Sequence, residues 1–149
     1  MTSRRITLCT LCALLPLLLA MRPVDETLLT AAMDGQLLQI KKLVEDGADV
    51  SAANAQGTTA LHAAAWNGHR DVVSFLLRKA APVNHVTSEG ATPLYIAAQN
   101  GHPEVAALLL NNGATANLAT TTGVTPLFIA AQNGYRDIVA LLLRHKADA

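Results

Sequence analysis

The feature that most constrains this chain is an internal repeat with a fixed period. Gly57, Gly90 and Gly123 are equally spaced along the chain, and they open the segments GTTALHAAA, GATPLYIAA and GVTPLFIAA. Residues 90–116 and 123–149 agree at sixteen of twenty-seven aligned positions. Agreement at this level predicts units that share one backbone and stack so that each contacts only its neighbours.

Each unit opens with the signals of a short helix. Thr59, Thr92 and Thr125 are predicted N-caps, because a threonine hydroxyl can accept a hydrogen bond from an otherwise unpaired amide of the first turn. Pro93 and Pro126 follow at the first helical position, where a missing N–H costs little. The glycines predicted to end this helix, where a left-handed backbone favours glycine, are Gly68, Gly101 and Gly134.

A second helix is predicted directly after that glycine in each unit. Asp71, Glu104 and Asp137 fall in its first turn, where the helix dipole favours negative charge. Ala80 and Lys146 stand where other units have the glycine that closes this helix, which predicts strained helix ends at both positions. The apolar stripe has the spacing of one helical face and in the second unit consists of Val72, Val73, Leu76 and Leu77.

These residues resemble the ankyrin repeat family, whose signature is Thr-Pro-Leu-His-x-Ala at a period of about 33 residues. The resemblance covers about residues 22–149 and implies an all-α solenoid of helix-turn-helix units joined by β-hairpin loops. Only His62 keeps the histidine of the signature, so the hydrogen bond to Thr59 that the resemblance implies is expected once. The units are expected at about residues 24–56, 57–89, 90–122 and 123–149.

A segment of another kind precedes the repeats. Residues 6–21, ITLCTLCALLPLLLAM, carry no charge and lie between two arginine-containing flanks, which is the layout of a secretory signal. As a helix they would reach roughly 24 Å against a hydrocarbon core of about 30 Å, and Pro16 would interrupt them. Residues 1–21 are therefore expected to be a signal peptide, and an uncleaved signal anchor or an apolar helix that caps the first unit are the alternatives.

This segment decides the expected location of the protein. A working signal predicts the secretory route, and an uncleaved anchor would be the chain's one contact with a membrane. If residues 1–21 are not a working signal, the expected location is the cytoplasm.

The composition and the motifs exclude several classes of function. Eleven Lys plus Arg balance eleven Asp plus Glu, and the only basic cluster is the N-terminal arginine pair, so no nucleic-acid interface is expected. Cys9 and Cys12 lack a second pair, and His69 and His102 are interpreted as helix-start residues held by local bonds rather than metal ligands. The sequence has no zinc-protease, phosphate-loop or nucleophile-elbow motif, so no catalytic site, metal, cofactor or small-molecule substrate is expected.

The candidate binding residues lie at the positions that the resemblance assigns to partner contact, which are hairpin tips, residues after the tip glycine and ends of first helices. Trp66 is the single tryptophan, and large aromatic side chains often contribute about 2 kcal/mol or more at an interface, so it is the first candidate. The alternative is that Trp66 only covers the end of the first helix of its neighbour. The full row is Met33, Asp34, Ala55, Gln56, Thr58, Trp66, Asn67, Ser88, Glu89, Ala91, Gln99, Asn100, Thr121, Thr122, Val124, Gln132 and Asn133.

The function expected from this row is a protein–protein interaction module that binds a partner protein through the concave face of hairpin tips and first helices. The alternative is that the chain is a fragment or isoform of a larger ankyrin-containing enzyme, channel or scaffold. This alternative is based on the last helix, because the end of a solenoid is expected to have a polar outer face. Instead, Ile138, Val139, Leu142 and Leu143 repeat the apolar pattern of the inner units.

Overall fold

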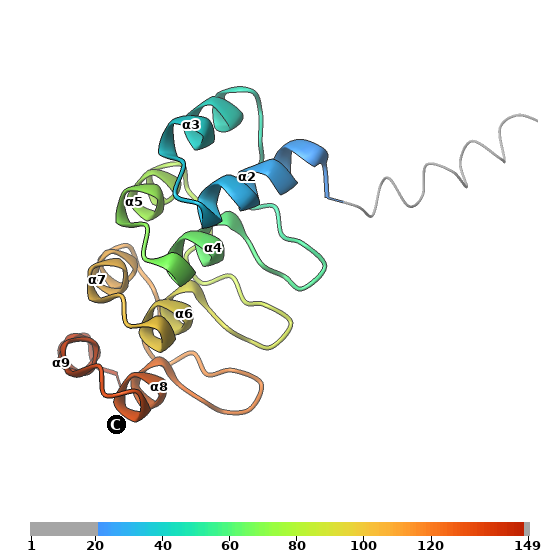
Figure 1. The fold of residues 1–149 in the computed structure, drawn as a ribbon. Coiled ribbons are helices and arrows are strands. Elements are labelled where there is room, and N and C mark those ends of the chain that lie inside the picture. The colour runs from blue at the N-terminus through green and yellow to red at the C-terminus, as the bar shows by residue number, and fades with distance from the viewer. Residues whose placement is uncertain (1–20, 148–149) are drawn as a thin grey trace, which may run out of the picture.

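The computed structural model describes residues 21–147, and within that range the chain forms helices and no strand. The helices are α2 (Pro23–Met33), α3 (Leu37–Glu45), α4 (Ala60–Asn67), α5 (Arg70–Arg78), α6 (Pro93–Asn100), α7 (Pro103–Asn111), α8 (Pro126–Gln132) and α9 (Arg136–Arg144). They form four antiparallel pairs in which the first helices α2, α4, α6 and α8 make one row and the second helices make another (Figure 1). The all-α solenoid predicted from the repeat is confirmed.

The predicted signal segment lies almost entirely outside the described residues. Between residues 21 and 147, none of the helices combines the length and the apolar character needed to cross a membrane.

The predicted caps set the bounds of the first helices. Thr92 Oγ1 accepts a hydrogen bond from the amide of Tyr95 at 3.0 Å, and Thr125 Oγ1 accepts one from the amide of Phe128 at 3.2 Å. The predicted strained ends of the second helices are present as well, because Ala80 and Lys146 have φ angles of 61° and 62°. Each of the two adopts a left-handed backbone that costs an L-residue roughly 1–2 kcal/mol.

The loops between units project beside the first helices as tight turns (Figure 1). Each is closed by a short main-chain hydrogen bond, such as Asn54 N–H to Thr58 O at 3.0 Å, but the described chain has a single isolated bridge, Ala53 with Thr59, in place of paired strands. Main-chain hydrogen bonds also join one loop to the next. The amide of Ser88 donates to the Gln56 carbonyl at 2.8 Å, so the loops form one continuous ledge.

The core lies between the two rows of helices and continues from unit to unit. Alanine pairs on the first helices are fully buried, as at Ala64 and Ala97, and they let neighbouring helices approach closely. Leucines at matching positions fill the space between the rows, and Leu61, Leu94 and Leu109 are at most 1% exposed. Burial of these side chains, at about 25 cal/mol per Å² of apolar surface, drives the stacking.

In the second, third and fourth units, an aromatic ring at the start of the second helix contacts the preceding unit. His69 Nε2 donates to the Met33 carbonyl and His102 Nε2 to the Trp66 carbonyl, both at 2.8 Å. The prediction that these histidines are held by local bonds was therefore wrong, since the bonds cross to another unit. Each ring also covers the glycine that ends the first helix of the preceding unit. The His69 ring covers Gly35, and the His102 ring covers Gly68.

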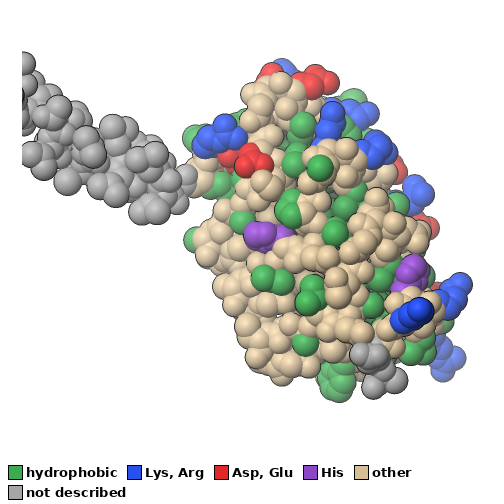
Figure 2. Space-filling view, turned by 180° about the vertical axis from the view of Figure 1, so that it is seen from behind, with side chains coloured by type: hydrophobic (Ala, Val, Ile, Leu, Met, Phe, Trp, Pro, Cys, Tyr) green, Lys and Arg blue, Asp and Glu red, His purple; other side chains and the backbone are tan. Residues whose placement is uncertain are grey.

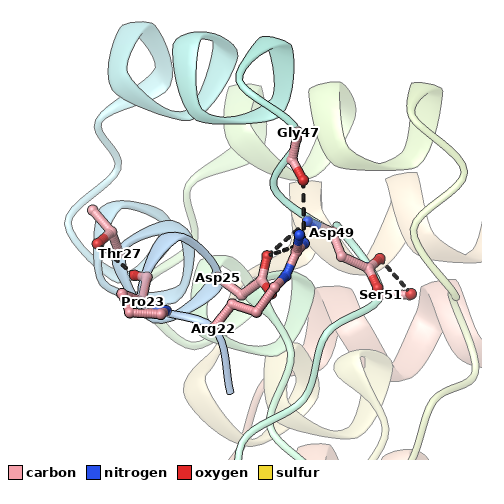
Figure 3. Close-up of polar contacts among 7 residues, drawn as sticks. All are labelled: Arg22, Pro23, Asp25, Thr27, Gly47, Asp49 and Ser51. Carbon is pink, nitrogen blue, oxygen red and sulfur yellow. Dashed lines mark hydrogen bonds and ion pairs between the residues drawn. The ribbon is translucent and has the colours of Figure 1, made fainter. Parts of the chain in front are cut away.

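The first unit departs from the others at its start. Its first helix begins at Pro23, about one turn earlier than in the other units, and it lacks their threonine cap. The carboxylate of Asp25, which is 3% exposed, is held by Arg22 at 2.8 Å and accepts a hydrogen bond from the amide of Asp49 at 2.8 Å (Figure 3). Arg22 also donates to the Gly47 carbonyl at 3.2 Å, so one buried carboxylate ties α2 to the loop after α3.

The last unit buries only part of its apolar stripe. Ile138 and Leu142 are at most 1% exposed because they face the preceding helices, whereas Leu143 is 49% exposed. Phe128 on α8 is 58% exposed, although its equivalent in the second unit, His62, is buried. The exposed large apolar side chains of the last unit are therefore Phe128, Tyr135 and Leu143 rather than the whole predicted stripe.

His62 makes the one reciprocal cap that the resemblance implies. The amide of Thr59 donates to His62 Nδ1 at 3.2 Å, the Thr59 hydroxyl lies 2.8 Å from the same nitrogen, and Nε2 donates to the Ala91 carbonyl at 3.2 Å. These partners fit a neutral ring. The pKa of His62 is lowered to about 4, chiefly because the ring is buried and to a smaller extent because His85 is near, and the hydrogen bond to the Ala91 carbonyl opposes this shift.

Replacing a glycine that a ring covers is expected to lower the free energy of unfolding more than replacing a glycine that no ring covers. In Gly68→Ala the new Cβ would lie 2.5 Å from His102 Nδ1. Gly134 has nearly the same φ, 77° against 72°, but a Cβ added there would meet no neighbouring residue within 4 Å. Both variants should lose roughly 1–2 kcal/mol through left-handed strain, and Gly68→Ala about 1 kcal/mol more because His102 must leave its carbonyl. Urea unfolding of both variants measures the difference, and equal losses would contradict the role given to the ring.

His62 is expected to make the protein less stable as the pH falls. Its folded pKa lies below the ordinary value of about 6.5, so the unfolded chain binds the proton first and stability drops as the pH falls from about 6.5 towards 4. Between pH 7 and pH 5 the loss should be about 2 kcal/mol. His62→Gln keeps an acceptor for the Thr59 amide but does not titrate, so it should lose clearly less stability over the same interval. Identical pH profiles in urea titrations would rule out this assignment.

Candidate protein-binding groove

A groove of about 770 Å³ runs between the first helices and the projecting loops of the first three units. Its helix wall carries Met33, Trp66 and Gln99, one from the end of each first helix. Because these three positions recur at the interval of the repeat, the stacking of identical units places them in one line. The loop wall opposite is formed by Gln56, Thr58, Ser88, Glu89, Thr121 and Thr122.

The floor of the groove is apolar and buried. Ala63 and Ile96 are 2% and 7% exposed, and they lie three residues before Trp66 and Gln99 on the same helices. Ala91, at 8%, belongs to this floor as well. The floor therefore offers an apolar surface between two walls that carry amides and hydroxyls.

Part of the row predicted from the sequence lines this groove. The predicted residues that the structure brings together there are Met33, Gln56, Thr58, Trp66, Ser88, Glu89, Ala91, Gln99, Thr121 and Thr122. The predicted residues that do not line it are Asp34, Ala55, Asn67, Asn100, Val124, Gln132 and Asn133.

Two of the residues outside the groove have an architectural contact instead. Asn67 Nδ2 donates to the Met33 carbonyl at 2.8 Å, and Asn133 Nδ2 donates to the Gln99 carbonyl at 3.0 Å. Each bond joins a unit to the preceding one. Asn100 differs, since its amide donates within its own helix, to the Ile96 carbonyl at 2.9 Å.

The groove also contains residues that the sequence reasoning missed. They are His62, Ala63, Thr87, Tyr95, Ile96 and Thr120. The sequence did contain a signal for Ala63 and Ile96. They lie three residues before the predicted contacts Trp66 and Gln99, and residues three apart on a helix share a face. The two threonines could not be found this way, since their place depends on how the loops fold against one another.

The groove is weakly acidic. Glu89 is exposed, and it is the carboxylate among the described lining residues, none of which is lysine or arginine. His62 adds no positive charge near neutral pH, since burial keeps its pKa at about 4. The groove can thus offer hydrogen bonds, apolar contact and one negative charge.

No metal-ligand cluster was found in the part of the chain that the structure describes, since no three His, Cys, Asp or Glu side chains come close enough to share an ion. The polar groups of the groove are amides and hydroxyls. Their chemistry suits hydrogen bonding to a ligand rather than metal coordination.

Trp66 is the most accessible large hydrophobic side chain in the groove. It is 51% exposed, and its backbone carbonyl is fixed by the hydrogen bond from His102 Nε2 at 2.8 Å. The next unit therefore holds the backbone that carries the indole. A rigidly mounted aromatic contact loses little conformational freedom when a partner binds.

Known proteins match this chain through its repeats. Family models for ankyrin repeats match residues 28–77 (many copies) and 79–149 (three copies). Curated relatives include Notch-regulated ankyrin repeat-containing protein A of Danio rerio and the Notch-regulated ankyrin repeat-containing proteins of Xenopus tropicalis and Homo sapiens. Each is 49% identical over 43 residues, which is 29% of this chain and 38% of the relative. Since the two models together span most of its length, the chain belongs to the ankyrin repeat family.

Proposed function

We propose that this protein is a binding module, without catalysis of its own, that holds a partner protein in the groove of the first three units. Ankyrin repeats are generally protein-interaction modules, which supports this class of function. The observation that carries the proposal is the half-exposed Trp66 at the helix wall, above an apolar floor. Trp is among the residues that most often dominate measured interface energies.

The groove is suited to binding because its walls are held in place before a partner arrives. The amide and the hydroxyl of Thr121 donate to the Glu89 carbonyl at 2.9 and 3.0 Å, which fixes the loop of the third unit to the loop before it. On the helix wall, His102 fixes the carbonyl of Trp66. Binding to such a surface orders few new groups, so more of the contact energy remains as affinity.

The spare polar groups of the walls support a protein ligand. The side chains of Gln56, Ser88 and Gln99 make no hydrogen bond with another residue of the described chain. Amides and hydroxyls can both donate and accept. They therefore match a ligand that presents alternating N–H and C=O groups, as a polypeptide does.

Trp66→Ala is expected to weaken partner binding at least about tenfold, because truncating a central aromatic contact costs about 2 kcal/mol or more. The measurement is quantitative mass spectrometry of proteins captured from a lysate by the tagged wild-type chain and by variants at equal concentration. Helical circular dichroism should stay unchanged, since the indole is not part of the core.

Leu38→Ala is the matched control, because Leu38 is an 83% exposed apolar residue on a second helix, away from the groove. It should retain every captured protein that Trp66→Ala loses. The assignment of the groove would be refuted if Trp66→Ala captured the same proteins as the wild type, or if Leu38→Ala lost the same proteins as Trp66→Ala.

A further inference from the structure

We propose that the segment held in the groove is an extended peptide in which an apolar side chain stands close to a lysine or arginine. The apolar side chain packs against Trp66 and the floor, and the basic group pairs with Glu89. This inference rests on the proposed function and adds the chemistry of the partner.

The first support is the separation of charge in the molecule. Among the described residues, Arg22 is the one basic side chain outside the second helices and their ends, and it is bound to Asp25 and the Gly47 carbonyl. Figure 2 shows Lys and Arg gathered over the second helices, while the loop side carries almost none. The other described basic residues are Lys41, Lys42, Arg70, Arg78, Lys79, Arg136, Arg144 and Lys146.

The second support is the place of Glu89. Its backbone is pinned by Thr121, so the loop presents the side chain at the groove from a fixed position. Its carboxylate makes no ion pair with any residue between 21 and 147, although the exposed carboxylates of Asp71 and Glu104 lie near Arg70. With no basic residue in the lining, a cationic side chain is attracted there and a nucleic-acid phosphate is repelled.

The third support is the shape and chemistry of the floor. Ala63 and Ile96 form the buried apolar floor, and Trp66 and Tyr95 add ring surface to the lining. An aliphatic or aromatic side chain placed there removes apolar surface from water on both sides of the contact. Two of the three floor residues, Ala63 and Ala91, are alanines, and their small side chains leave room for such a group.

The fourth support decides for an extended rather than a helical segment. A helix satisfies its own main-chain groups internally, whereas an extended segment leaves its N–H and C=O groups free for the walls. Gln56, Ser88 and Gln99 offer unused hydrogen-bonding groups on opposite walls. The groove also runs along the stack across three units, which suits a ligand longer than one side chain.

The test uses short random peptides displayed on phage and selected on the full chain. Selected peptides should share an apolar residue close to Lys or Arg. One of them, labelled with a fluorophore, is then titrated by fluorescence polarisation with the wild type, Trp66→Ala, Glu89→Gln and Glu45→Gln. Glu45 is an exposed carboxylate at the end of α3, outside the groove lining, and serves as the charge control.

Trp66→Ala should weaken the titrated peptide about tenfold or more. Glu89→Gln should lower the affinity roughly two- to fivefold, which is the range of an exposed ion pair. Glu45→Gln should leave the affinity unchanged. The effect of Glu89→Gln should vanish for a peptide whose basic residue is replaced by glutamine, and binding of the original peptide should weaken with salt.

Two results separate this inference from the proposed function. Peptides that need Trp66 but show no basic residue and no response to Glu89→Gln would overturn the inference and leave groove binding intact. Selected peptides that bind Trp66→Ala as well as the wild type would overturn both.

Discussion

The structure depends on a contact in which the ring at the start of one second helix covers the glycine that ends the first helix of the preceding unit. The His69 and His102 rings reach the carbonyls of Met33 and Trp66 at 2.8 Å. A side chain on the covered glycine would take the place of the ring, and the left-handed backbone there also favours glycine. In the first three units, Gly35, Gly68 and Gly101 thus serve the helix end and the interface at once, whereas Gly134 of the last unit serves the helix end without a covering ring.

This contact also sets the spacing of the groove. Because each ring binds the carbonyl of a groove residue, Met33 and Trp66 are held at the distance that stacking imposes. The loops repeat the same principle on the other wall through the hydrogen bond from Ser88 to Gln56. The architecture fixes main-chain atoms and leaves side chains free, so the binding surface can change in chemistry without a change in fold.

The sequence predicted the elements well because their signals are local. Thr92, Pro93 and Gly101 act within one helix, and the structure places each as a cap or helix start. The buried carboxylate of Asp25 was not predicted, because it depends on the distant amide of Asp49, whereas the early start of α2 had a local signal in Pro23 that was overlooked. Much of the groove followed from the repeat frame, but the places of Thr87 and Thr120 and the cross-unit bonds of Asn67 and Asn133 required the stacked structure.

The single tryptophan gives the protein an intrinsic optical reporter. Its indole is 51% exposed at the groove wall, and the chain has no second tryptophan to mask its emission. An indole that loses its contact with water emits at shorter wavelength, so a ligand that covers this wall shifts the natural fluorescence of the unlabelled chain. Tryptophan emission therefore distinguishes a ligand seated in the groove from one bound on the second helices, without any added dye.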